Sequence, residues 1–195
     1  MFRSILFIFF LLFLNISLAQ KSFYIGIGNI STFGNTSSNG QSFKSSNIND
    51  FGLFLGNQFL VNNFFKFNVE CFYLNNQLVL AKKNNGNYET RKRFELHQNL
   101  GLCLKPGIYK ENNSFYFIFS VLGVYVFEKE EYTGRQFDRF DESYGYGFEY
   151  SHNIFNNFIL SIGYMYSQFE TYSSFTNHTM TSFSVIHLTL NYSLY

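Results

Sequence analysis

The sequence has no tryptophan, one proline and two cysteines among its 195 residues, and only 14% of its residues are charged. Two cysteines are too few for a disulfide scaffold, and the composition fits neither a collagen-like chain nor a coiled coil. Fourteen Lys and Arg residues against 13 Asp and Glu exclude the broad basic face of a nucleic-acid-binding protein. The length is that of a single domain.

Aromatic residues are abundant instead, with 28 Phe and 15 Tyr making up 22% of the chain. A hydrophobic content of 46% argues against disorder. The mean hydropathy of −0.07 argues against a bundle of membrane helices. This combination is typical of strands that alternate apolar and polar residues.

The first 19 residues have the pattern of a secretory signal peptide. Arg3 supplies a positive start, an apolar run of ten residues follows from Ile5 to Leu14, and small residues precede the Ala19–Gln20 junction. A retained membrane helix is the alternative, but it needs about 20 apolar residues. We therefore expect cleavage between Ala19 and Gln20. Residues 20–195 then form one domain with 13 basic and 13 acidic side chains, because only Arg3 is lost.

The dominant hydrophobic period in the rest of the chain is two, which places one apolar row on one face of each strand. We count eight strands. One of them, 115–127, is apolar on both faces, so its register stays open. The other strands are expected around 23–28, 50–56, 65–73, 96–105, 144–151, 160–167 and 186–194.

The connections alternate between two kinds. Short links near 59–63, 110–114 and 152–157 are centred on Asn pairs, and Asn tolerates the left-handed conformation of tight turns. The remaining connections are predicted as long polar loops. In an up-and-down barrel all long loops lie at one end, as in outer-membrane barrels. The long loops are expected near 31–47, 75–93, 128–142 and 168–181.

The row opposite the apolar one contains Gly, Ser, Thr and Asn together with Lys66, Glu70, Lys105 and Glu149. Such residues suit the interior of an eight-stranded barrel, which is just wide enough for its own side chains. Parity alone does not tell inward from outward. The aromatic load, the export signal and the loop asymmetry favour an apolar row that faces lipid. Aromatic girdles at the membrane interfaces are then expected at Tyr73, Tyr144, Tyr166 and Tyr192.

These features resemble the small eight-stranded outer-membrane β-barrel proteins of Gram-negative bacteria, of the OmpA and OmpX type. The likeness covers residues 20–195 and is a pattern rather than a sharp motif. The resemblance implies an all-β, closed, eight-stranded, antiparallel, up-and-down transmembrane barrel in the bacterial outer membrane. It is carried by the glycine-punctuated segments 23–28 and 51–59, by the strand with Glu70, and by 144–150.

Reactive residues give little support for chemistry. Cys71 is expected to point outward near the loop end and Cys103 inward near the turn end, so a disulfide is disfavoured. The four His residues have no metal-ligand spacing, and His187 is expected to be hydrogen-bonded inside the barrel. A lipid hydrolase would need Ser, His and an acid on one face. His178 lies in a Ser-rich loop and there is no GxSxG, so we expect no enzyme, no metal and no cofactor.

The expected function is structural and adhesive, with a barrel that presents four polar loops at the cell surface. One long loop is basic and the next is acidic, so the loops are candidates to contact lipopolysaccharide, other outer-membrane lipid or a host-surface partner. We expect a monomer without nucleic acid. The open alternatives are a small porin-like channel, a lipid-modifying hydrolase and a soluble exported barrel for an apolar ligand. The basic residues are Lys82, Lys83, Arg91, Lys92 and Arg93, and the acidic ones are Glu128, Glu130, Glu131, Asp138, Asp141 and Glu142.

Overall fold

The computed structural model describes residues 21–38, 41–45, 49–84, 87–130, 136–155, 157–173 and 176–194. Met1 to Gln20, and with them the expected signal peptide and its Ala19–Gln20 junction, lie outside these ranges. Within them the chain forms strands and no helix. The strands are β1 Lys21–Ser38, β2 Gln41–Ser45, β3 Asn49–Leu60, β4 Phe65–Asn84, β5 Asn87–Lys110, β6 Asn113–Glu130, β7 Gln136–Phe155, β8 Phe158–Ser173 and β9 Thr176–Ser193.

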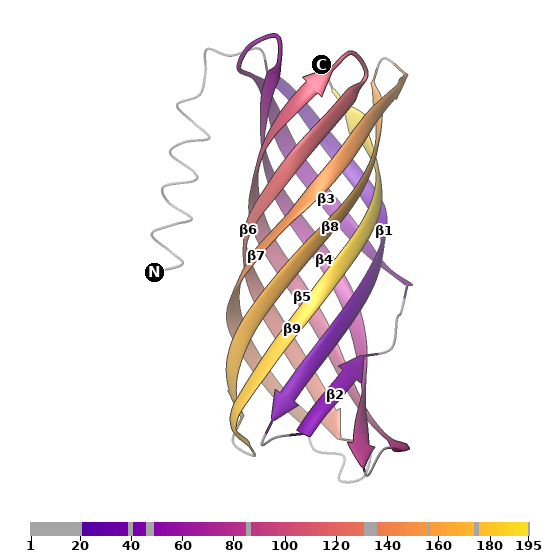
Figure 1. The fold of residues 1–195 in the computed structure, drawn as a ribbon, viewed down its shortest axis with the longest axis vertical. Coiled ribbons are helices and arrows are strands. Elements are labelled where there is room, and N and C mark those ends of the chain that lie inside the picture. The colour runs from indigo at the N-terminus through magenta and orange to yellow at the C-terminus, as the bar shows by residue number, and fades with distance from the viewer. Residues whose placement is uncertain are drawn as a thin grey trace.

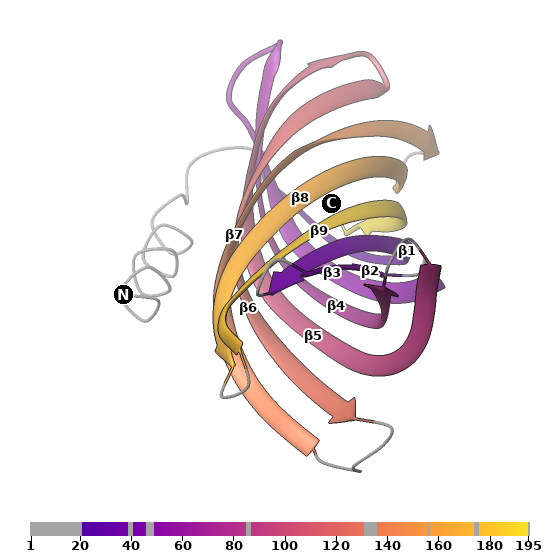
Figure 2. The same ribbon diagram turned by 60° about the horizontal axis from the view of Figure 1, so that its bottom comes forward.

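Eight of these strands close into an antiparallel barrel (Figure 1). Each barrel strand pairs with the next along the chain, and β9 pairs with β1 to complete the ring. The short β2 pairs with the ends of β1 and β4 at one rim. The predicted closed, eight-stranded, up-and-down barrel is therefore confirmed. Figure 2 shows the strands curving around a single axis.

The stagger of the barrel follows from the strand register. Following paired residues once around the ring from Ile25 leads back to β1 at Asn35, ten residues further along. Closing eight strands with such a stagger requires them to tilt strongly against the barrel axis, typically by about 35–45°. The tilt is plain in Figure 1.

The two ends of the barrel differ less in loop length than the sequence suggested. At one end, which we name the turn end, the links are 61–64, 111–112 and 156–157. At the other, the hairpin end, the strands continue through most of the residues expected as loops: β4 and β5 reach Asn84 and Asn87. The prediction of long loops was wrong for the described residues, because these polar segments continue the strand pairing beyond the apolar rows, as in the pairs Lys82–Glu89 and Asn84–Asn87.

The turns are held by local backbone chemistry. The Asn62 side-chain oxygen accepts hydrogen bonds from the backbone N–H groups of Phe64 and Phe65, both at 2.8 Å. The β5–β6 turn is Glu111–Asn112, one residue earlier than the Asn pair suggested. Glu111 has φ 55°, a left-handed conformation that is uncommon outside Gly and Asn.

The register that the sequence left open is resolved along β6. Tyr116, Ile118 and Leu122 are buried inside the barrel, whereas Phe117 and Phe119 are more than half exposed on its outer face. The strand reads as continuously apolar because its inner face packs into an apolar part of the lumen while its outer face carries the apolar row.

Candidate functional site

The outer face of the barrel carries a belt of large apolar side chains. Leu100, Ile162 and Leu188 are 57%, 53% and 50% exposed, although side chains of this kind are normally buried in soluble proteins. The expected orientation, with the apolar row pointing outward, is confirmed. The belt includes Ile25, Ile27, Leu53, Leu55, Leu100, Phe117, Phe119, Tyr146, Phe148, Ile162, Leu188 and Leu190.

The belt has clear boundaries. Tyr73, Tyr144 and Tyr166 point outward and each is followed in its row by a polar residue on the hairpin side, for example Glu142 after Tyr144. Tyr192 lies on the outer face close to the turn end. On β9 the outward row from Ile186 to Leu194 covers about 27 Å along the strand at ~3.4 Å per residue. For a strand tilted by about 40°, this corresponds to roughly 20 Å along the barrel axis, close to the ~25 Å apolar band of outer-membrane barrels.

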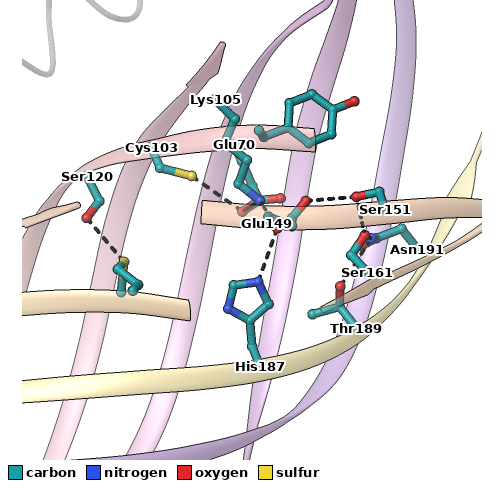
Figure 3. Close-up of polar contacts among 12 residues, drawn as sticks. Glu70, Cys103, Lys105, Ser120, Glu149, Ser151, Ser161, His187, Thr189 and Asn191 are labelled. Atoms are coloured by element: carbon teal, nitrogen blue, oxygen red, sulfur yellow. Dashed lines mark hydrogen bonds and ion pairs between the residues drawn. The ribbon is translucent and has the colours of Figure 1, made fainter. Parts of the chain in front are cut away.

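Inside the barrel, near the turn end, three charged side chains form a buried group that we name the charged layer. Lys105 Nζ lies 2.8 Å from Glu70 Oε1 and 2.7 Å from Glu149 Oε2. All three residues are at most 4% exposed. Lys105 therefore bridges β4 and β7 across the lumen from β5, as Figure 3 shows. Because these carboxylates are buried, the contacts with Lys105 compensate for the hydration that they have lost.

Neighbouring side chains satisfy the remaining carboxylate oxygens. The Tyr24 hydroxyl donates to Glu70 Oε2 at 2.8 Å, and the Cys103 thiol lies 3.4 Å from Glu70 Oε1. Ser151 Oγ donates to Glu149 Oε1 at 3.1 Å. His187 Nε2 lies 3.1 Å from Glu149 Oε2, and an ionised carboxylate only accepts, so Nε2 carries the hydrogen.

His187 reaches Glu149 because β8 has a glycine beside it. A Cβ on Gly163 would lie 2.3 Å from His187 Nε2, which is far inside contact distance. The buried imidazole, 5% exposed, therefore occupies the space that a side chain at position 163 would fill. The sequence expectation of a hydrogen-bonded His187 inside the barrel agrees with this geometry.

The hydrogen bonds continue around the wall beyond the charges. Ser151 and Ser161 hydroxyls are 2.8 Å apart, and Asn191 Nδ2 donates to Ser161 Oγ and to Thr189 Oγ1, both at 3.2 Å (Figure 3). Gln58 on β3 donates separately to the Tyr116 hydroxyl on β6 at 2.8 Å. The connected contacts around the charged layer come from β1, β4, β5, β7, β8 and β9, and the separate pair adds β3 and β6. Sequence reasoning missed Tyr24 and this chain of hydroxyls and amides, although their inward parity was visible, and it missed Tyr116 because the register of 115–127 was open.

On the hairpin side of the charged layer the lumen is filled by apolar side chains, a group that we name the apolar layer. Ile30, Leu122 and Val185 are fully buried, and Phe54 and Phe72 are at most 5% exposed. The expected small and polar residues line much of the lumen, but this part of it is filled by large apolar side chains. The apolar layer consists of Ile30, Phe54, Phe72, Leu74, Cys103, Ile118, Leu122, Val124, Met165, Phe183 and Val185.

The space left inside the described part of the lumen is small. One cavity of about 20 Å³ lies between the two layers, next to Phe72 and Lys105. A second, of about 10 Å³, opens near the turn end beside Asn68, Tyr116 and Glu149. Each is large enough for about one water molecule. Both cavities are lined by inward-facing side chains of the two layers and of the turn end.

Lys66, the fourth residue expected in the charged interior, lies apart from the other three. It sits near the turn end, half-buried, with its ammonium 4.4 Å from the centre of the Tyr109 ring. This is a cation–π contact at the mouth of the barrel. The inward positions of β4 are Lys66, Asn68 and Glu70 in turn, so Lys66 lies two inward positions closer to the turn end than Glu70.

The cysteines are both free, but their placement corrects one detail of the sequence prediction. Cys71 and Cys103 lie on neighbouring strands at the same level, because Cys71 pairs with Leu102 and Glu70 with Cys103. They were expected at opposite ends. What keeps them apart is the pleat: Cys71 points outward and Cys103 inward, so their sulfurs are on opposite faces of the sheet.

Other candidate chemistry finds little support in the described residues. They contain no group of three or more His, Cys, Asp or Glu placed to hold a metal ion. No helix among them is long and apolar enough to cross a membrane. His187 is enclosed in the lumen and does not meet a serine on an exposed face. The side chains of His178, Lys82, Lys83, Arg91, Lys92 and Arg93 lie outside the described set.

Comparison with solved structures gives the same fold. Neisserial surface protein A superposes with a TM-score of 0.58 at 12% identity, covering 87% of this chain and 96% of that one. Ail of Yersinia pestis, solved with the heparin analogue sucrose octasulfate, gives 0.52 at 14% identity, covering 88% and 99%. OprG from Pseudomonas aeruginosa gives 0.50 at 11% identity, covering 89% and 96%.

These likenesses establish the fold that the sequence resemblance implied, that of the small outer-membrane β-barrel proteins. At such identities they establish the fold alone. No family model and no curated protein sequence matches this chain.

Proposed function

We propose that this protein is an integral protein of the bacterial outer membrane that anchors surface-exposed hairpins and acts there by contact. One observation carries the proposal: within the described residues a belt of large apolar side chains is exposed around the barrel, whereas Glu70, Lys105 and Glu149 are buried in the lumen. In water this arrangement would leave an apolar surface far larger than soluble monomers tolerate. In a bilayer it places hydrocarbon against hydrocarbon and leaves no backbone group unpaired.

The packed lumen favours an anchoring role over transport. The charged layer ties the strands together across the interior, and the apolar layer blocks the space above it. A closed barrel of this width has room for its own side chains only. We therefore propose that no wide diffusion pathway exists and that a monomer is the working form.

The hairpins beyond the belt are the parts available for contact. The β4–β5 hairpin extends far past Tyr73, and residues 82–93 of it contain five basic side chains and one acidic one. The structurally similar Ail was solved with a sulfated heparin analogue. For this chain we propose that the basic β4–β5 hairpin contacts anionic surfaces, such as sulfated or phosphorylated polysaccharide.

The membrane part of the proposal is tested by fractionation and gel mobility. The protein should sediment with outer membranes, resist extraction by salt and require detergent for release. Unheated samples should migrate faster on gels than boiled ones, because a closed barrel stays folded in detergent. A salt-extractable protein that folds to the same β-rich state without detergent would overturn the proposal.

The contact part is tested with heparin as the probe. Replacing Lys82, Lys83, Arg91, Lys92 and Arg93 by Gln should abolish retention on immobilised heparin at about 0.15 M salt, where exposed charges act over ~8 Å. A control with the same change in net charge, glutamate at Thr171, Ser173, Thr176, Asn177 and Thr179, should retain binding. Equal loss in both variants would show a general charge effect instead of a hairpin site.

A further inference from the structure

The outward row of β7 contains an irregularity above the belt. From the turn end it runs through Phe148, Tyr146 and Tyr144, is interrupted by the exposed Glu142, and then presents Phe140, which is 59% exposed. A large aromatic side chain thus follows a charged one on the same face. Lipid tails do not explain it, since the belt has already ended at Tyr144.

The ring of Phe140 is held flat against the sheet by a glycine on the neighbouring strand. A Cβ on Gly123 would lie 2.6 Å from Phe140 Cζ and 2.9 Å from its Cε2. The ring therefore occupies space that a side chain at position 123 would need. Tyr125, 38% exposed, is the register partner of Phe140, and Gly123 is the partner of Glu142. Two aromatic side chains and a carboxylate are thus grouped on one surface of the paired strands β6 and β7.

The level of this surface follows from the strand geometry. Phe140 is four residues beyond Tyr144, about 13 Å along the strand at ~3.3 Å per residue. With a tilt of about 40°, that places it roughly 10 Å outside the girdle along the barrel axis. If the proposed membrane placement holds, the neighbours at this level are the headgroups of the outer leaflet and not the acyl chains.

On this basis we propose that Phe140, Glu142 and Tyr125 form a binding site for the saccharide headgroup of an outer-leaflet glycolipid. The proposal rests on the proposed membrane placement. The C–H face of a sugar ring is apolar and packs against an aromatic ring, while its hydroxyl groups donate to a carboxylate, which only accepts. An exposed flat phenyl ring with a carboxylate two residues away offers both contacts to one sugar.

Two other occupants fit the surface less well. Acyl chains would surround Glu142 with hydrocarbon, and the transfer of an ionised carboxylate from water to hydrocarbon has a large free-energy cost. A second copy of this chain, related by a two-fold axis through the same surface, would bring the two Glu142 carboxylates toward each other. A headgroup rich in hydroxyl donors meets the ring and the carboxylate without either penalty.

The absence of tryptophan from the chain allows a direct test. The full barrel with Phe140→Trp is reconstituted in nanodiscs that contain a glycolipid either with its core saccharide or trimmed to its lipid A part. With the saccharide present, we expect quenching of the single tryptophan by a soluble quencher to fall, because a sugar ring packed on the indole covers one of its faces. Phe119→Trp, in the belt, should give the same quenching in both discs.

A second variant pair avoids dependence on the tryptophan. Phe140→Ala and Glu142→Gln should each reduce the core glycolipid that copurifies with the barrel, while the belt control Phe119→Ala should not. Equal quenching of Phe140→Trp in both discs, or unchanged copurification in both variants, would overturn the site. Protection that rises with protein density instead would assign the surface to a second copy. Heat-modifiable mobility of each variant reports membrane folding separately, so this site can fail while the barrel proposal stands.

Discussion

The charged layer and the apolar layer fill the lumen of one barrel with opposite kinds of side chain. In the charged layer, Lys105 is held between two carboxylates at hydrogen-bonding distance, and every charge has a named partner. In the apolar layer, Leu122 and Val124 are fully buried and depend on shape alone. The charged layer needs a specific geometry and should not tolerate the loss of one member. The apolar layer should tolerate exchanges that conserve side-chain volume, because its side chains contribute to stability separately.

The comparison suggests a division of work within the lumen. Polar contacts link residues from strands far apart in sequence, such as Glu70 and Glu149, and so fix which strands face each other. Apolar packing excludes water from the remaining space and contributes stability in proportion to the area buried. Each of the following experiments changes residues in or beside one layer and measures the free energy of unfolding in urea with lipid vesicles.

The largest effect is expected from Lys105→Met. The substitution leaves Glu70 and Glu149 buried without their cation, and breaking a buried ion pair in this way costs about 3–5 kcal/mol. Replacing the whole group, with Glu70→Gln, Lys105→Met and Glu149→Gln together, should restore most of the loss. A single-variant cost below about 1 kcal/mol would contradict the role of the charged layer, since exposed pairs contribute that little.

In the apolar layer, Leu122→Ala should cost about 3 kcal/mol, within the range for a fully buried leucine that leaves a cavity. Leu122→Met, which conserves volume, should cost less than about 1.5 kcal/mol. The contrast between the two variants measures packing directly. If Leu122→Ala cost no more than Leu122→Met, the layer would be loosely filled and the lumen would not be sealed by shape.

Gly163→Ala should destabilise the barrel by about 1–3 kcal/mol, because the new Cβ displaces His187 from Glu149. The double variant Gly163→Ala with His187→Ala should lose less than the sum of the two single losses, since the clash disappears with the imidazole. A double-mutant cycle reports this coupling. Strict additivity would show that the glycine and the histidine do not compete for space.

The smallest effect separates two serines in similar positions. Ser161 links Ser151 and Asn191 beside the charged layer, so Ser161→Ala should cost about 1–3 kcal/mol through the loss of two buried hydrogen bonds. Ser120 lies beside the apolar layer and donates only to Met165 Sδ at 3.2 Å, so Ser120→Ala should cost less than about 1 kcal/mol. A reversed order of the two costs would contradict the division between the layers.

Much of the fold could be predicted because the alternation of side chains along a strand is written directly in the sequence. The outward rows through Ile25, Leu100, Ile162 and Leu188 were assigned correctly, and Glu70, Lys105 and Glu149 were placed on the inward parity. Connections were harder to predict. Polar residues such as those after Tyr73 are typical of loops, but backbone hydrogen bonds to neighbouring strands are enough to keep them extended.

The lumen was predicted only in part for a different reason. Inward apolar residues such as Phe72 and Leu74 alternate with outward apolar residues, so one row cannot be told from the other where both are apolar. Along β6 this removes the period altogether. Contacts between distant strands, such as Tyr24 with Glu70 or His187 with Glu149, depend on the stagger of the closed barrel, which no local pattern reveals.

The central claim, that the apolar belt faces lipid and the polar row faces the lumen, is tested most directly at two adjacent residues of β6. Phe117→Trp and Tyr116→Trp each introduce the only tryptophan into the chain, on opposite faces of one strand. In vesicles of lipids brominated on their acyl chains, the fluorescence of Phe117→Trp should be strongly quenched and that of Tyr116→Trp should be unaffected. Quenching of Tyr116→Trp with protection of Phe117→Trp would contradict the account.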